Sequence, residues 1–158
     1  MKRIFVMSLF GVMLLTLAAT AQQPAGTAPM PAQILNAKAV FISNTGSIPY
    51  NISGGSNRLY VSFYQQMQAA GSFRIVNDPK KADLTLEPRY FSTLNFLNTP
   101  EVQLSIYDPA THVLLWTLNQ SIEPCALRKA CDRNLDSALT SLAMQVMQLR
   151  SQAWVGVN

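Results

Sequence analysis

The spacing of apolar residues changes along this chain from a strand pattern to a helix pattern and back, which limits the folds open to it. Residues 39–42 form a short β-branched and aromatic run that is typical of a buried strand. Leu59, Phe63 and Met67 then recur every four residues, which predicts a helix of about four turns. Because glycine readily adopts the left-handed conformation that ends helices, we expect this helix to end at Gly71.

The second half of the chain favours strands before it returns to a helical spacing. Strands are expected over residues 73–76, 82–91, 102–106 and 113–118. The Asp78-Pro79 turn predicts that the first two form a hairpin, whose second strand is bent or interrupted at Pro88. Asp108-Pro109 predicts a hairpin between the last two. A long amphipathic helix is expected at the end, on the stripe Leu135, Leu139, Leu142, Val146 and Leu149.

This order of elements predicts an α+β fold. Two helices that each carry one apolar stripe can cover one face of a sheet, while the other face stays partly open. We therefore expect a single two-layer domain over residues 37–152, with a mixed or antiparallel sheet of about five strands and two helices packed on one face. Residues 22–36 lack any apolar period and are expected to form a flexible arm, and residues 153–158 a short tail.

The first 21 residues have the order of a cleavable secretory signal peptide. Lys2 and Arg3 precede an apolar run over residues 4–18, and Ala19-Thr20-Ala21 supplies small residues at the cleavage site. This run is shorter than the roughly 20 residues that cross a bilayer as a helix, so a membrane anchor is the weaker alternative. We expect cleavage after Ala21 and a product in the periplasm or outside the cell, with no stable transmembrane segment.

The charge pattern argues against one class of partner. The chain has a formal net charge of +4, which falls to +2 without Lys2 and Arg3 of the leader. The remaining charges alternate in sign, as where Lys80 and Lys81 lie between two aspartates. They form no basic stripe of the kind that binds phosphate backbones, so we expect no nucleic-acid partner.

Two cysteines, Cys125 and Cys131, lie six positions apart. In an oxidising compartment an isolated pair this close is expected to form a disulfide. A metal site would need two further ligands, and the chain's single histidine, His112, belongs to the turn after Asp108. Neither cysteine follows the leader directly, so lipid attachment at that point is not expected. We expect neither a metal nor another cofactor.

Motifs of known catalytic sites are missing from the sequence. It contains no Gly-x-Ser-x-Gly elbow, no His-Glu-x-x-His pair and no Walker loop. The best local binding candidate is an anion site at the helix start, since free N–H groups and a nearby arginine attract anions; its residues are Gly54, Gly55, Ser56 and Arg58. The competing interpretation is structural, with glycines that allow the turn and Ser56 or Asn57 as the helix cap. A hydrolase with an unrecognised carboxylate pair also stays open.

Most aromatic residues fall on periodic segments and are expected in the core, Trp116 among them. Phe96 and Leu97 are exceptions, because they lie in the connection between two predicted strands. Exposed apolar residues of loops often contact partners. The sequence therefore indicates these two residues as candidate partner contacts.

Short motifs also occur in a recognisable order. The helix ends in Gly71-Ser72-Phe73, and the later motifs are Ile75-Val76-Asn77-Asp78-Pro79, Ala82-Asp83-Leu84-Thr85-Leu86-Glu87, Tyr107-Asp108-Pro109 and Leu115-Trp116. Over most of residues 37–150 this resembles exported bacterial proteins related to the TolB amino-terminal domain and the CsgG-like curli secretion group. The resemblance implies an envelope protein that contacts partner proteins and performs no catalysis. We therefore expect an exported interaction or assembly protein, with a small-ligand or anion-binding periplasmic domain as the alternative.

Overall fold

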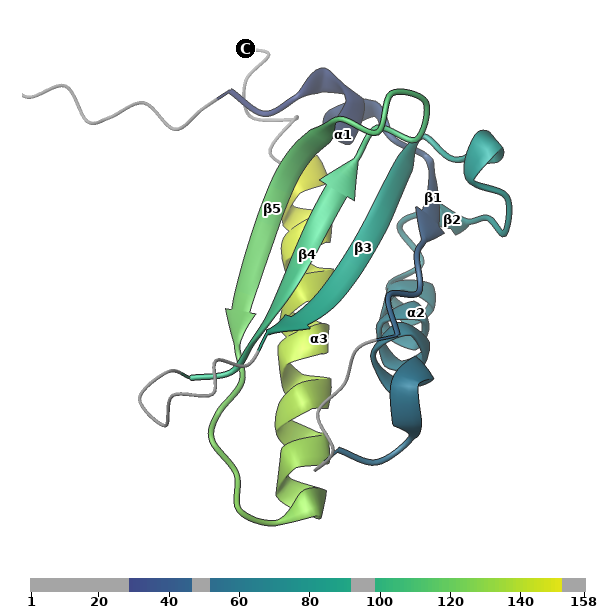
Figure 1. Ribbon diagram of the computed structural model, residues 1–158. Helices are drawn as coiled ribbons and strands as arrows, with labels where there is room; N and C mark the ends of the chain where they lie inside the picture. Colours follow the sequence, from purple (N-terminus) through teal and green to yellow (C-terminus); the bar gives the residue numbers. More distant parts are fainter. Residues whose placement is uncertain (1–28, 47–51, 92–98, 152–158) are drawn as a thin grey trace, which may run out of the picture.

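One mixed sheet of five strands lies at the centre of the computed structural model, which describes residues 29–46, 52–91 and 99–151 (Figure 1). The strands are β1 (Ala39–Ile42), β2 (Arg74–Ile75), β3 (Leu84–Phe91), β4 (Glu101–Tyr107) and β5 (Leu114–Ser121). Their order across the sheet is β2-β1-β3-β4-β5. β1 runs parallel to both of its neighbours, whereas β4 is antiparallel to β3 and to β5.

Two long helices, α2 (Arg58–Ala70) and α3 (Arg128–Ser151), lie on the same face of the sheet, behind the strands in Figure 1. On β3, Leu84 and Leu86 are fully buried, whereas Thr85 and Glu87 on the opposite face are partly exposed. Gly71 ends α2 in the left-handed conformation, with φ of 64°. The predicted α+β architecture, with two helices on one face of a five-stranded mixed sheet, is therefore confirmed.

The hairpin predicted over residues 73–91 is wrong. β2 and β3 do not pair with each other, because β1 lies between them and pairs with both in parallel. Val40 and Ile42 on β1 are almost fully buried, as in a central strand. The Asp83 carboxylate fixes the start of β3 beside β1, because its Oδ2 accepts hydrogen bonds from the backbone N–H groups of Lys38 and Ala39, both at 2.8 Å.

Pro88 does not interrupt β3, so of the two expected outcomes, a bend or an interruption, the interruption is wrong. The strand pairs with β4 without a break from Thr85 to Phe91. On the other side, the carbonyl of Leu86 accepts from Ser43 N–H at 2.9 Å and the carbonyl of Pro88 accepts from Thr45 Oγ1 at 2.8 Å. The missing N–H of Pro88 therefore faces the side where β1 has already ended, and no ladder bond is lost.

The predicted hairpin of β4 and β5 is confirmed, and Asp108 holds its turn. The Asp108 N–H donates to the carbonyl of Val113 at 3.0 Å, and the Asp108 carboxylate accepts from the N–H of Ala110 at 2.8 Å. This hydrogen bond from Ala110 is the main cause that lowers the pKa of Asp108. Trp116 on β5 is only half-buried, not a core residue as expected, because β5 is the outer strand of the sheet.

The domain begins earlier than the sequence indicates. Residues 32–36, which were expected to belong to the arm, form the short helix α1 (Ala32–Asn36), and its Ile34 is only 1% exposed. Residues 22–28, the leader and the tail at 153–158 lie outside the described residues, as do Phe96 and Leu97.

The predicted disulfide between Cys125 and Cys131 is present. It joins the connection after β5 to the first turn of α3, where Cys131 is buried. A search of the described helices for a stretch long and apolar enough to cross a membrane finds none.

Candidate functional site

The loop before α2, proposed from sequence as an anion site, is bound by carboxylates of α3. The backbone N–H of Ser53 donates to Asp132 Oδ1 at 2.8 Å. Arg58 Nη2 lies 2.8 and 2.7 Å from the two carboxylate oxygens of Asp136. The hydrogen bond from Ser53 is the main cause that lowers the pKa of Asp132. Because Asp132 and Asp136 are one helical turn apart, α3 presents both to this loop.

Within this loop, two glycines adopt backbone conformations that the turn requires. Gly54 and Gly55 have φ of 96° and 66°, a conformation that other residues rarely adopt. Neither Ser56 nor Asn57 caps α2 with its side chain, and Asn57 Oδ1 instead accepts from Asn44 Nδ2 at 2.8 Å. Asp136 thus pairs with the arginine that the anion site would use, which favours a structural role for the loop, although without the expected side-chain cap. The anion site stays a prediction.

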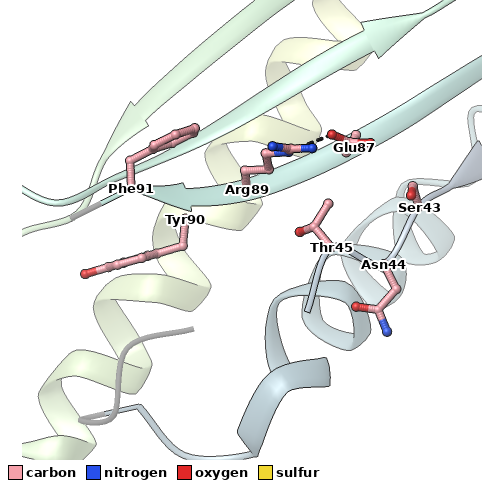
Figure 2. Close-up of a pocket in the computed structure, with 7 residues that line it drawn as sticks. All are labelled: Ser43, Asn44, Thr45, Glu87, Arg89, Tyr90 and Phe91. Atoms are coloured by element: carbon pink, nitrogen blue, oxygen red, sulfur yellow. Dashed lines mark hydrogen bonds and ion pairs between the residues drawn. The ribbon is translucent and has the colours of Figure 1, made fainter. Parts of the chain in front are cut away.

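A groove of about 440 Å³ lies at the end of β3, where β1 no longer covers its edge (Figure 2). Its walls come from the chain after β1 and from the last half of β3; the lining residues are Ser43, Asn44, Thr45, Glu87, Arg89, Tyr90 and Phe91. Figure 2 shows Glu87, Arg89 and Phe91 on one face of β3 and Tyr90 on the other. The groove therefore follows the edge of the strand.

Main-chain groups of β3 face this groove. The carbonyls of Leu86 and Pro88 point toward the β1 side, where Ser43 and Thr45 bind them. Since the direction of backbone groups alternates along a strand, the N–H and carbonyl of Tyr90 point the same way. Among the described residues, no strand pairs with Tyr90 on that side. An unpaired strand edge of this kind is a template for another extended chain.

Side chains around the groove provide both polar and apolar contacts. Arg89 Nε lies 2.7 Å from Glu87 Oε1, and the exposed fractions of the two side chains are 55% and 18%. Phe91 is 42% exposed, which is large for a phenylalanine on a strand. Most aromatic residues of periodic segments were expected in the core, and Phe91 is an exception. Strict alternation from the buried Leu84 and Leu86 puts Phe91 on the outer face, and this signal was present in the sequence.

A second, apolar groove of about 320 Å³ lies between α2 and the β1–β2 edge. Tyr60 and Tyr64 of α2 line it, with ring centroids 5.9 Å apart, opposite Phe41 and Ile75. It offers aromatic surface without a charged side chain in its lining.

Several carboxylates of the described chain have identifiable structural partners. Those of Asp83, Asp108 and Asp132 accept backbone N–H bonds, which lower their pKa values, and Glu87 and Asp136 pair with arginines. A general acid of a hydrolase needs a raised pKa instead. In the same part of the chain, no three His, Cys, Asp or Glu side chains gather as a metal site would require. His112 is exposed in the turn between β4 and β5.

Comparison with known proteins finds a likeness of fold only. No protein-family model matches the chain, and no curated protein matches it significantly in sequence. PelC from Paraburkholderia phytofirmans, described as a dodecamer, is 15% identical with a TM-score of 0.44, over 72% of this chain and 86% of PelC. Lipoprotein B from Nitrosomonas europaea is 10% identical with a TM-score of 0.42, over 78% and 87% of the two chains.

A minor lipoprotein from Acinetobacter baumannii is 16% identical with a TM-score of 0.34, over 73% of this chain and 94% of that protein. At these identities and TM-scores the likeness concerns coarse topology, and no residue role passes from those proteins to this chain. None of the three is described as a TolB or CsgG protein. The specific resemblance to that group therefore stays a prediction.

Proposed function

We propose that this is an exported, non-catalytic domain that binds an extended segment of a partner protein in the cell envelope, in the groove at the end of β3. The proposal of export rests on the leader, whose charged start, apolar run and small residues at the cleavage site are typical of a secretory signal peptide. The proposal of a contact function rests on the groove.

One observation carries the proposal: on its β1 side the backbone of Tyr90 pairs with no strand of the described residues, and it lies beside the exposed ring of Phe91. An extended peptide can add to an open strand edge, so that main-chain bonds give affinity and alternate side chains give specificity. Phe91 offers it an apolar contact, and Arg89 with Glu87 offers a polar rim. Phe91 also directly precedes the segment that contains Phe96 and Leu97, the partner contacts predicted from sequence.

A photo-crosslinking residue placed at position 91 in the native host tests this proposal. We expect it to capture one envelope protein, whereas the same residue at position 61 captures none. Val61 is the matched control because it is also 42% exposed but lies on α2, away from the groove.

Purified partner then allows a direct affinity measurement. Loss of one large apolar contact at the centre of an interface should raise Kd about tenfold or more in Phe91→Ser, while Val61→Ser changes it less than about twofold. Both variants should melt close to the unmodified protein, since the side chains are exposed. Equal effects of the two substitutions on Kd, or crosslinks at position 61 alone, would contradict a contact role for the groove.

A further inference from the structure

β5 forms one edge of the sheet, and its outer side pairs with no strand of the described chain. The even-numbered residues of β5 bond to β4, as the bond from Ile122 N–H to the carbonyl of Pro100 shows at the end of the strand. Because backbone direction alternates, the N–H and carbonyl groups of Thr117, Asn119 and Ser121 point outward. The edge therefore presents a regular row of donors and acceptors.

Within the eight residues of β5, Leu114 to Ser121, this edge lacks two features that usually prevent strand pairing, charged residues and proline. Leu114 and the preceding Val113 are 51% and 55% exposed, and Trp116 on the helix side is only half-buried. A strand of this length and composition is a template for a second strand.

From this we infer that β5 pairs with β5 of a second copy of this chain, antiparallel about a two-fold axis, to give one continuous sheet of ten strands across a dimer. An uncharged strand meets itself without like-charge repulsion, which makes the edge complementary to itself. In a register that places Thr117 of one copy opposite Asn119 of the other, the two Leu118 side chains face each other on the helix side. Each then partly covers the other.

The opposite edge of the sheet explains why a closed pair, and not a filament, is inferred. β2 has only two residues, Arg74 and Ile75, and it is followed by Lys80 and Lys81 in a 3₁₀ turn. A head-to-tail contact between β5 and β2 would be weak, because β2 offers few backbone groups and the nearby lysines disfavour strand pairing. Only the β5–β5 contact uses a long edge on both sides, and such a contact closes after two copies.

Amide hydrogen exchange of the exported protein over a range of concentrations tests the dimer. In a monomer, the outward N–H groups of Thr117, Asn119 and Ser121 exchange rapidly, whereas that of Leu118 is protected by β4. We expect the outward amides to become protected as sedimentation shows the mass doubling. A protein that stays monomeric at all concentrations, or a dimer in which these amides remain unprotected, would overturn the inference.

Asn119→Pro removes one outward N–H and leaves the bonds between β4 and β5 intact. Two intermolecular bonds are lost per dimer, so Kd for dimerisation should rise about tenfold or more. Asn119→Ala is the matched control, because both variants lose the side-chain bond from Gln103 Nε2 but alanine keeps the N–H. If Asn119→Pro fails to fold, Asn119→Lys replaces it, since like charges across the axis should also weaken the dimer. Protection of the outward amides only in the presence of another protein would assign this edge to that protein instead.

Discussion

Gly54 is a position where backbone conformation and packing both require glycine. Its φ is 96°, and a Cβ atom there would lie 3.0 Å from Arg58 Cδ. Gly55, with φ of 66°, has nothing within 4 Å of such a Cβ. The two neighbouring glycines therefore separate the cost of conformation from the cost of contact.

We expect Gly55→Ala to lower the free energy of unfolding by about 1 kcal/mol, the usual cost of a left-handed alanine. Gly54→Ala should cost about 1 kcal/mol more, because the added methyl displaces Arg58 from Asp136. Urea unfolding of both variants measures the difference. Equal losses would show that the Arg58 side chain yields without weakening its ion pair.

Substitution of His112, the single histidine of the chain, tests whether this domain is catalytic. His112 is exposed and is the one non-glycine residue of the described chain with positive φ, at 56°. His112 therefore lies in a turn with its side chain exposed, and no enclosed site of the described residues surrounds the imidazole. We expect His112→Ala to change the free energy of unfolding by less than about 0.5 kcal/mol and to leave cellular function intact. A well-folded His112→Ala variant without function would point to a catalytic role.

Residue types around the 52–58 loop could be read from the sequence, but their partners could not. Two glycines before an arginine fit both an anion site and a structural turn. Asp132 and Asp136 favour the structural turn, and they are more than seventy positions away from the loop. No local spacing relates them to Arg58, because their proximity depends on how α3 packs against α2.

At the scale of elements, Asp83 joins β1 to β3. The N–H bonds from Lys38 and then Ala39 hold the pKa of its carboxyl below the usual range. A group whose pKa is lowered by folding stabilises the fold fully above its unfolded pKa of about 4, and this contribution is lost as pH falls through the lowered value. Asp83→Asn should therefore reduce stability at neutral pH and flatten the loss of stability as the pH falls below about 4.

Urea unfolding at several pH values measures this effect. The fall in stability should not disappear in Asp83→Asn, because the pKa values of Asp108 and Asp132 are lowered as well. If the protein and the Asp83→Asn variant lose stability in parallel as the pH falls, the junction between β1 and β3 does not depend on the charge of Asp83.

Trp116 shows how position within the sheet sets the cost of a substitution. It lies opposite the fully buried Ile106 of β4, on the helix side, but at the outer strand it stays partly exposed. We expect Trp116→Ala to cost about 1.5–3 kcal/mol, less than the 3–5 kcal/mol of a fully buried tryptophan. Leu104→Ala, at a fully buried position of β4, is the reference, with an expected cost of about 2–5 kcal/mol. Chemical denaturation at protein concentrations well below the Kd of the proposed dimer compares the free energies of unfolding of the two variants.

Element types followed from the sequence more reliably than element pairing. The β4–β5 hairpin was predictable because its turn, with Asp108 bound to local N–H groups, lies within the paired segment. The pairing of β2 and β3 with β1 depends instead on residues more than thirty positions apart. Asp78-Pro79 does form the predicted turn, in which the Asp78 carboxylate accepts a hydrogen bond from Lys80 N–H. However, this turn connects β2 to β3, which are not neighbours in the sheet.

At the scale of the whole molecule, the sheet has one covered and one open face. α2 and α3 cover the apolar side (Figure 1), and the residues of β3, β4 and β5 on the opposite side are mostly polar. Polar contacts join α3 to the α2 region at both ends: Asp132 binds Ser53 and Asp136 binds Arg58 at the start of α3, and Arg150 near its end binds the carbonyl of Ser72. The disulfide ends in the first turn of α3.

Cys125 and Cys131 provide the last prediction, because their bond fixes the start of α3 to the chain that leaves β5. Closing a loop of this length stabilises the fold by about 2 kcal/mol in the chain-entropy model. We expect the reduced protein to lose about that amount and still fold, since the core lies mostly between α2, α3 and the sheet. Cys131→Ser should cost more than Cys125→Ser, because position 131 is 2% exposed and a buried hydroxyl adds a desolvation cost. Peptide mapping of the exported protein without reductant, followed by urea unfolding of both variants, checks each step; full alkylation of both thiols before reduction would exclude the bond.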